Sequence, residues 1–336
     1  MTQLLAASIG SYPRTGEDKD QQRFPRALGH FERKEISAHA LRDVEQSVAQ
    51  EIIREQLDAG VDEVTDGLIK WFDPISRFTA HLSSTKSGGL VRYFDNNFYY
   101  RQPLITASPK IGPPVSPLEF RFARDVSNKP VRAILTGPLT LAMHTGATAK
   151  AYVKLPARVD FFTDVLIQEV AGLGAENATV IQIDEPSLVA HPEYLPLVKA
   201  AAAKLAAVKG KSRLAIALYF GSALPVLDSL KDMPFDVWHV DILRNRPEAL
   251  LKLAAAPKTV AVGLGVLDGR TTTLEPADAV AASINGWLAD RSGATHYLSA
   301  SCGLEYLPRK SASAKLQRLS DIRRQLAGIV VGTPRG

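Results

Sequence analysis

The stretch AHALRDVEQSVAQEIIREQLDAGVDEVT, residues 38–65, sets the pattern on which the fold prediction rests. Its apolar residues recur three to five positions apart, which predicts an amphipathic helix over residues 38–59. Gly60 stands where a helix typically ends in a left-handed cap. Residues 61–65 then read as a short strand, so the stretch is one helix-to-strand unit. The apolar face of the helix comprises Leu41, Val44, Val48, Ile52 and Leu57.

Strands and helices alternate along most of the chain. The predicted strands cover residues 4–8, 61–65, 131–135, 178–183, 214–218, 236–241, 260–264 and 296–300. The predicted helices cover residues 38–59, 157–173, 192–208, 222–232, 247–255, 277–290 and 312–328. Such alternation indicates a parallel sheet, and eight units predict a single (β/α)8 TIM barrel over residues 1–336. An open doubly wound sheet is the alternative, although no Gly-x-Gly-x-x-Gly follows the first strand.

Residues 68–130 break the alternation and form an insertion after the second strand. Within it, residues 90–102 hold two aromatic, β-prone runs around Asp-Asn-Asn, which predicts a β-hairpin. Long insertions in barrels are usually functional. We expect this hairpin to cover or border the barrel mouth, or to make the contact of a homodimer.

Composition excludes several classes of protein. The 336 residues are 46% hydrophobic and 22% charged, which is typical of a globular protein. One cysteine, Cys302, rules out a disulfide framework. The net charge of +5 is spread over scattered lysines and arginines, so nucleic-acid binding is not expected. No signal peptide or membrane helix is predicted, and we expect a soluble, cytoplasmic protein.

Polar and glycine-rich strings follow several predicted strands, where a barrel enzyme places its active site. They are Ile-Gly-Ser-Tyr-Pro at 9–13, Leu-Thr-Gly-Pro-Leu-Thr at 135–140, Gln-Ile-Asp-Glu-Pro at 182–186 and Ser-Cys-Gly-Leu at 301–304. Together, and in this order, they resemble the cobalamin-independent methionine synthase family. The length is similar to that of the single-barrel core members.

This resemblance implies a methyltransferase that moves a methyl group onto the thiol of homocysteine, the small-molecule substrate, in methionine synthesis. In the family, zinc holds the thiol as a thiolate. Full-length members use methyltetrahydrofolate as donor, whereas core members are associated with methylcobalamin on a corrinoid partner protein.

The zinc ligands carry over in part. Cys302 matches a ligand cysteine of the family, and Asp241 stands where the family has a glutamate ligand. The family's His-x-Cys pair is absent, because residues 217–222 read Ala-Leu-Tyr-Phe-Gly-Ser. His239 lies two residues before Asp241, so both side chains share one strand face, and Cys302, Asp241 and His239 are the predicted zinc ligands. The alternative is a hydrogen-bonded core histidine with Cys302 as a small buried hydrophobe.

The resemblance also implies roles in substrate binding. Asp184 inherits the role of pairing with the amino group of homocysteine, and Ile9 and Ser11 that of holding the amino acid. With Cys302, Asp184 makes the predicted catalytic pair. Glu185 is a further substrate-binding candidate, or a structural ion-pair partner.

Three residues occupy positions that bind the methyl donor in the family: His144, Asp268 and Arg270. Methyl transfer from a folate amine needs a proton for the leaving group. Arginine cannot supply this proton, and His144 is the alternative acid. A methyl–cobalt donor needs none. The alternatives to methionine synthesis are a non-catalytic or regulatory paralogue without zinc, and a related alkyl-thiol or demethylase enzyme.

Overall fold

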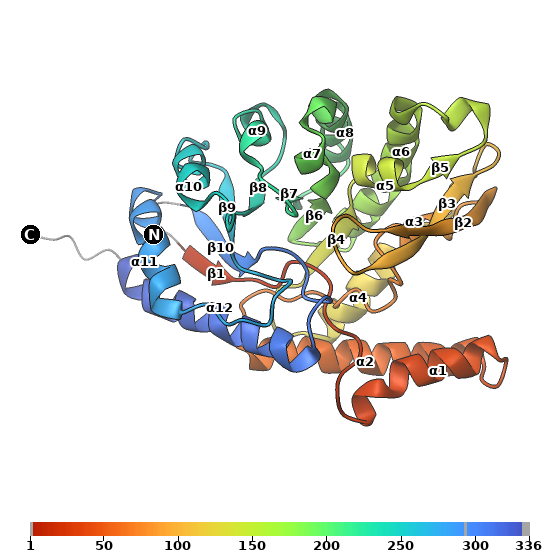
Figure 1. The fold of residues 1–336 in the computed structure, drawn as a ribbon, viewed down its shortest axis with the longest axis horizontal. Coiled ribbons are helices and arrows are strands. Elements are labelled where there is room, and N and C mark those ends of the chain that lie inside the picture. The colour runs from red at the N-terminus through yellow and green to blue at the C-terminus, as the bar shows by residue number, and fades with distance from the viewer. Residues whose placement is uncertain (1–2, 292–293, 331–336) are drawn as a thin grey trace, which may run out of the picture. The chain divides into compact units, whose positions relative to one another are not determined.

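The computed structural model describes residues 3–291 and 294–330, which form two compact units (Figure 1). Of the described residues, 3–70, 121–132, 263–291 and 294–330 build the first unit, and 71–120 and 133–262 build the second. The ends of the predicted single domain, residues 1–2 and 331–336, lie outside the described residues, as do residues 292–293. That single domain stays a prediction.

The first unit contains three parallel strands and the helices that follow them. Strand β1 pairs with β10, and β10 pairs with β9, both in parallel. Helices α2 and α12 run side by side (Figure 1). The elements are β1 (Gln3–Ala6), the 3-10 helix η1 (Asp20–Gln22), α1 (Arg23–Glu32), α2 (Ala38–Asp58), the end of α4 (Ser116–Val126), most of β9 (Ala261–Leu267), α11 (Ala277–Asp290), β10 (Thr295–Ala300) and α12 (Arg309–Val330).

The predicted strand at residues 61–65 is reduced to two isolated bridges, Ala7 with Glu63 and Val64 with Val131. The reason lies in the side chain of Gln56, which is fully buried on α2. Its amide accepts from the backbone N–H of Thr65 at 3.0 Å and donates to the Thr65 carbonyl at 2.9 Å. A buried glutamine thus takes the place of a ladder partner.

A buried ion pair ties the first residue of β4 to this bridged segment. Arg132 donates to the carboxylate of Glu63, with Nε at 2.9 Å, and both side chains are at least 97% buried. The guanidinium also stacks 4.6 Å from the ring centre of Tyr297 on β10. Two buried charges therefore neutralise each other, 69 residues apart in sequence.

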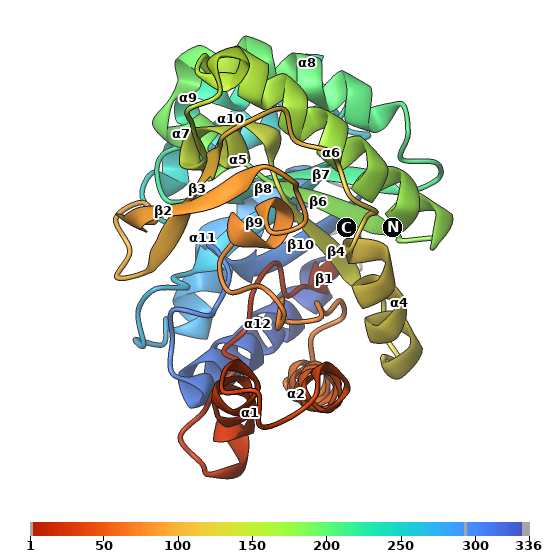
Figure 2. The same ribbon diagram turned by 90° about the vertical axis from the view of Figure 1, so that its right-hand side faces the viewer.

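The second unit holds the remaining strands and most helices. Strands β6, β7 and β8 are parallel neighbours, and α6 and α8 lie side by side (Figure 2). Its elements are α3 (Ser76–Thr79), β2 (Thr85–Arg92), β3 (Tyr99–Ile105), β4 (Arg132–Thr136), α5 (Pro138–His144), β5 (Gly146–Ala147), η2 (Lys150–Tyr152), α6 (Leu155–Ala175), β6 (Val180–Asp184), α7 (Pro186–Ala190), η3 (Pro192–Tyr194), α8 (Leu195–Ala206), β7 (Arg213–Leu218), α9 (Leu224–Leu227), η4 (Leu230–Asp232), β8 (Val237–Asp241) and α10 (Arg246–Ala254).

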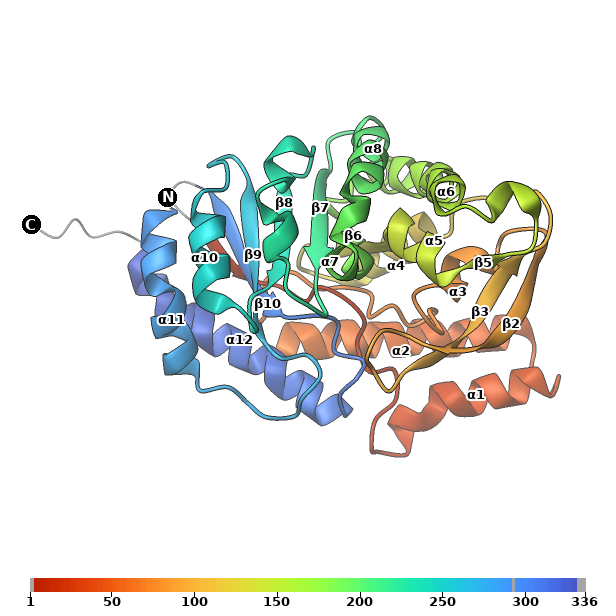
Figure 3. The ribbon, with the colours of Figure 1, turned by 45° about the horizontal axis from the view of Figure 1, so that its top comes forward.

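A small separate sheet forms within the second unit. Strands β2 and β3 pair antiparallel from Arg92 opposite Tyr99 to Thr85 opposite Ile105, and β5 joins β3 in parallel (Figure 3). The pair occupies the part of the chain for which a hairpin is predicted, with longer strands. Its expected place at a barrel mouth stays a prediction.

The chain has an α/β fold, with a seven-stranded sheet in the order β1-β10-β9-β8-β7-β6-β4. Strand β9 contributes residues to both units. The eight-stranded barrel stays a prediction, because residues 61–65 form bridges instead of a full strand. The helix predicted over residues 222–232 is broken into α9 and η4, with Pro225 in the first turn of α9. Among the described residues, no helix combines the length and apolarity needed to cross a membrane.

Replacing Glu63 by glutamine should destabilise the protein by about 3–5 kcal/mol, because it leaves the buried charge of Arg132 uncompensated. Urea unfolding measures this change. The matched control is Asp160→Asn, which breaks an ion pair with Lys204 in which the aspartate is 70% exposed. That change should cost less than about 1 kcal/mol. Equal losses for the two variants would contradict the buried ion pair.

Candidate active site

The backbone at the end of β6 is clamped from both sides. The N–H of Gly137 donates to the carbonyl of Asp184 at 2.8 Å, and the N–H of Glu185 donates to the carbonyl of Ala217 at 2.9 Å. The neighbouring strand ends therefore hold the Asp184–Glu185 peptide in one position.

The carboxylate of Glu185 caps the N-terminus of helix α5. It accepts from the backbone N–H groups of Leu139 at 2.9 Å and Thr140 at 3.0 Å, and from the Thr140 hydroxyl at 2.7 Å. Glu185 is fully buried, and any side chain at Gly137 would collide with it. Glu185 is predicted to bind substrate. In the structure its carboxylate caps the start of helix α5. Glu185 thereby helps to hold the neighbouring residue, Asp184, in position.

Asp184 is partly exposed. Gln182 Nε2 donates to Oδ1 at 2.7 Å, and Tyr219 Oη donates to Oδ2 at 3.0 Å. Both donors are neutral, so they orient the carboxylate without cancelling its charge. An oriented, partly solvated carboxylate is suited to bind an ammonium group.

His144, at the end of α5, is a neutral ring at pH 7. Burial, with His191 nearby, lowers the pKa of His144 to about 4. Tyr100 Oη lies 2.9 Å from its Nδ1 and donates to its backbone carbonyl at 3.0 Å. The carbonyl takes the single hydroxyl proton, so Nδ1–H donates to Tyr100 and the lone pair is on Nε2. A neutral His144 has no proton at Nε2 to give to a leaving group.

Aromatic rings surround His144. The ring centres of Tyr93 and Phe94 lie 5.1 and 4.9 Å from the imidazole, and Phe220 lies 5.3 Å from Phe94. We call Tyr93, Phe94, His144 and Phe220 the ring cluster. Tyr219 connects the cluster to Asp184, because its ring centre lies 4.6 Å from that of Phe220.

The predicted substrate-binding residues of the first unit lie where two backbone segments approach closely, which the absence of a side chain on glycine permits. A Cβ on Gly10 would lie 2.9 Å from Gly303 Cα, and the N–H of Leu304 donates to the carbonyl of Ser11 at 2.7 Å. Ser11 is partly exposed, whereas Ile9 is buried. Ser11 is thus fixed by its backbone with its hydroxyl beside Gly303.

Asp268 and Arg270 lie in the loop between β9 and α11. Asp268 Oδ1 accepts from the Arg270 N–H at 2.8 Å, which closes a local turn. Glu275 accepts from the Asp268 N–H at 2.7 Å, and the fully buried Lys315 donates to Glu275 at 2.7 Å. The loop is therefore held in place from α12.

The predicted zinc ligands belong to different units, Cys302 to the first and Asp241 and His239 to the second. Cys302 is 2% exposed, its sulfur lies 3.3 Å from the Gly303 carbonyl, and a Cβ on Gly269 would lie 2.8 Å from it. Asp241 Oδ1 accepts from the N–H of Leu243 at 3.0 Å, and His239 is 2% exposed. Within residues 3–291 and 294–330, no three His, Cys, Asp or Glu side chains gather as metal ligands. No catalytic step is assigned to zinc.

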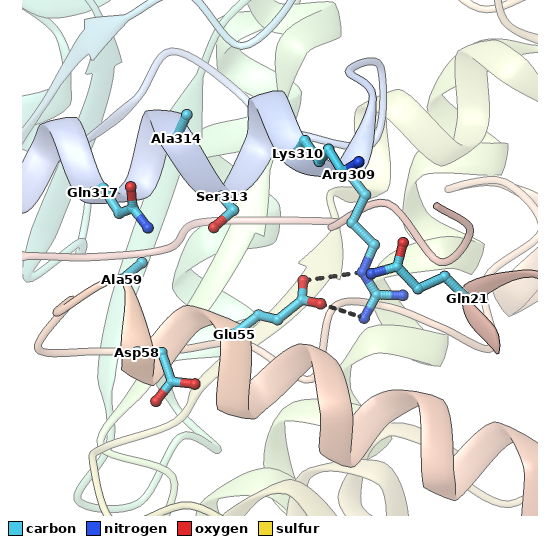
Figure 4. Close-up of a pocket in the computed structure, with 9 residues that line it drawn as sticks. All are labelled: Gln21, Glu55, Asp58, Ala59, Arg309, Lys310, Ser313, Ala314 and Gln317. Atoms are coloured by element: carbon cyan, nitrogen blue, oxygen red, sulfur yellow. Dashed lines mark hydrogen bonds and ion pairs between the residues drawn. The ribbon is translucent and has the colours of Figure 1, made fainter. Parts of the chain in front are cut away.

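A polar pocket of about 360 Å³ opens between η1, α2 and α12 of the first unit (Figure 4). Arg309 faces Glu55 across it, with Nε at 2.9 Å from the carboxylate, and Nη2 reaches Glu51 at 2.7 Å. Arg309 is thus paired with two carboxylates, and these ion pairs link α12 to α2. The pocket contains none of the predicted site residues. It is lined by Gln21, Glu55, Asp58, Ala59, Arg309, Lys310, Ser313, Ala314 and Gln317.

Sequence analysis missed the partners of Asp184 and the ring cluster. Gln182 lies two residues before Asp184 on the same strand, and therefore on the same face. Asp184 pairs with Ala217 on β7, so Tyr219, two residues further on, lies on that face too. The two-residue spacings, from Gln182 to Asp184 and from Ala217 to Tyr219, were the features of the sequence that could have identified these partners.

Comparison with known proteins assigns nearly the whole chain to one family. Residues 4–325 match the model described as cobalamin-independent synthase, catalytic domain. A methionine synthase of Saccharolobus islandicus is 28% identical over 318 residues, which are 93% of this chain and 92% of that protein. The methionine synthase of Sulfolobus acidocaldarius is 28% identical over 320 residues, 94% of this chain and 90% of that protein.

Two solved structures share the fold. A B12-independent methionine synthase from Shewanella sp. W3-18-1, in complex with selenomethionine, has a TM-score of 0.81 at 19% identity, covering 98% of this chain and 99% of that one. A putative vitamin-B12 independent methionine synthase from Listeria monocytogenes has a TM-score of 0.72 at 18% identity, covering 97% and 98%.

Glu185 should give the protein a distinct pH dependence. Burial raises the pKa of Glu185 from 4.5 to about 7, while hydrogen bonds from Thr140 and Leu139 work against the rise. The folded protein thus keeps a proton that the unfolded chain has already lost. The contribution of Glu185 to the free energy of unfolding should fall as pH rises from about 4.5 to 7, and stay constant above.

Urea unfolding between pH 5 and 8 measures this effect. The stability of the wild type relative to Glu185→Gln should drop by up to about 3 kcal/mol across that window. The exposed control, Glu17→Gln, should leave the wild-type slope unchanged. A flat difference curve for Glu185→Gln would contradict the raised pKa.

Proposed function

The chain belongs to the family of cobalamin-independent synthases, which makes it a methyltransferase, and from this premise we propose that it methylates the sulfur of homocysteine. The reaction yields methionine. The related archaeal proteins carry the name methionine synthase, and the structural neighbour from Shewanella holds selenomethionine.

The observation that carries this proposal is the oriented carboxylate of Asp184. Gln182 and Tyr219 fix its two oxygens, and Glu185 fixes the backbone behind it. In the proposed complex, the ammonium group of homocysteine pairs with Asp184. The hydroxyl of Ser11 and the backbone at Ile9 are proposed to hold the carboxylate end of the amino acid.

The thiol must lose its proton before it attacks, because the thiolate is the nucleophile. In the family, bound zinc supports this ionisation. Among the described residues no three side chains gather as metal ligands, so the proposal includes no metal step, and the thiol proton passes to solvent.

The methyl donor of the proposed reaction lies near His144, which takes the donor-binding position of the family. Its low pKa and its proton on Nδ1 leave it unable to protonate a folate amine at pH 7. Methyltetrahydrofolate and methylcobalamin, the latter standing for a corrinoid partner, are the two donors to compare. Asp268 and Arg270 remain proposed donor contacts.

Asp184→Asn should raise the KM for homocysteine roughly ten- to hundred-fold, because a hydrogen bond to a charged group is lost, with a smaller effect on kcat. Steady-state kinetics with each donor measures both constants. Asp160→Asn, on the exposed face of α6, should keep wild-type values. If KM stays constant, Asp184 does not bind the acceptor. Wild-type protein inactive with every donor would favour the non-catalytic alternative.

Elemental analysis of protein purified without chelator tests the metal assignment. Without three gathered ligands, we expect far less than one zinc per chain in the wild type, and no change in Cys302→Ala. A full equivalent of zinc that disappears in Cys302→Ala would instead establish the set Cys302, Asp241 and His239.

A further inference from the structure

The polar pocket between η1, α2 and α12 has no part in the proposed methyl transfer. Its volume of about 360 Å³ falls within roughly 300–1,000 Å³, the range of small-molecule sites. All nine residues that line it belong to the first unit. Charged, amide and hydroxyl groups predominate among them, and Ala59 and Ala314 are the only apolar side chains of the nine. The pocket is therefore suited to a small polar solute.

Four charges hold the wall of the pocket and cancel one another. Arg309 binds Glu55 through Nε and Nη2, both at 2.9 Å, and binds Glu51 through Nη2 at 2.7 Å. Arg23 pairs with the other carboxylate oxygen of Glu51. Two guanidinium groups and two carboxylates thus leave no net charge, and they keep Glu55 and Arg309 in fixed positions.

Two opposite charges of the pocket remain free. Asp58 on α2 and Lys310 on α12 are exposed, and their charged groups form no ion pair or hydrogen bond within residues 3–291 and 294–330. They lie apart, on either side of Ser313 (Figure 4). A ligand that matches both must bring a negative and a positive group of its own, at separate positions.

The part of the pocket at Lys310 offers hydrogen-bond donors. Arg309, the preceding residue, is 2% exposed, and its Nη1 has no hydrogen-bond partner among the described residues. A guanidinium nitrogen with unused hydrogens and a neighbouring ammonium group together favour a carboxylate. The part at Asp58 offers only carboxylate oxygens as its charged group, and favours an ammonium group.

We propose that this pocket binds a small zwitterion with a carboxylate at one end of a short chain and an ammonium group at the other, as in a short peptide with free ends. The carboxylate pairs with Lys310 and Arg309, and the ammonium group pairs with Asp58. Ser313 and Gln317 hydrogen-bond to the polar groups between the two ends. The inference goes beyond the proposed methyl transfer and does not depend on it, since none of the residues assigned to that reaction lines this pocket.

Nuclear magnetic resonance titration of the 15N-labelled full chain with triglycine tests where the zwitterion binds. The amide signals of α2 around Asp58 and of α12 around Ser313 should shift as triglycine is added. Absence of a shift in these two segments would overturn the proposal, whether or not signals elsewhere respond. Asp184→Asn, which alters the proposed acceptor site, should leave these shifts unchanged.

Blocked peptides test the two charges. N-acetyltriglycine lacks the ammonium group and triglycinamide lacks the carboxylate, so each should bind roughly two- to five-fold more weakly than triglycine, the range of a partly exposed ion pair. Glycine carries both charges on one carbon and should also bind more weakly. Any of the three binding as tightly as triglycine would overturn the proposal. The affinity of 6-aminohexanoate, which has the terminal charges without peptide groups, distinguishes an ω-amino acid from a peptide.

Variants assign the charges to residues. Asp58→Asn and Lys310→Gln each remove one charge from an exposed side chain, and each should weaken triglycine binding roughly two- to five-fold. In Asp58→Asn, triglycine and N-acetyltriglycine should bind equally, because the ammonium group has lost its partner. A difference as large as in the wild type would place the ammonium group elsewhere and overturn the proposal. Asp160→Asn and Lys199→Gln, exposed charges of the second unit, are the matched controls and should keep wild-type affinity.

Discussion

The buried carboxylate of Glu185 is the constraint on which the candidate site depends. It caps the two N–H groups and the hydroxyl at the start of α5, and so fixes the helix that ends in His144. The same residue is bonded through its backbone to β7. Asp184 is consequently held in place by its neighbour in the sequence. The cost is a carboxyl group that is buried away from water, with its pKa raised to about 7.

Much of the fold follows from periodicity. The apolar stripe of α2 and the continuous apolar runs of β6, β7 and β9 predicted those elements, because burial on one face or on both leaves a periodic record. The strand at residues 61–65 was predicted too long, since its ladder partner at Thr65 is the side chain of Gln56. A side chain that replaces a backbone partner produces no periodic pattern in the sequence.

The site was predictable to a lesser degree. Motifs at strand ends predicted roles for Asp184, His144 and Glu185, but sequence order does not tell which of two adjacent carboxylates faces the helix; in the structure that of Glu185 does. The ring cluster is assembled from a turn, a helix end and a strand end that are far apart in sequence. Phe94 and Phe220 in it have φ angles of 51° and 68°, which contradict local backbone preference, so no propensity indicates them. The zinc set stays a prediction, because Cys302 belongs to one unit, where it packs against Gly269 and Gly303, and Asp241 and His239 belong to the other.

The discontinuity of the first unit has a consequence during synthesis. Strand β1 pairs with β10, from Gln3 opposite Thr295, so its partner leaves the ribosome long after it. The second unit ends at residue 262 and is complete earlier. At roughly 5–20 residues per second, the final segment takes several seconds to emerge. Throughout that interval one edge of β1 is an open template for pairing with other nascent chains.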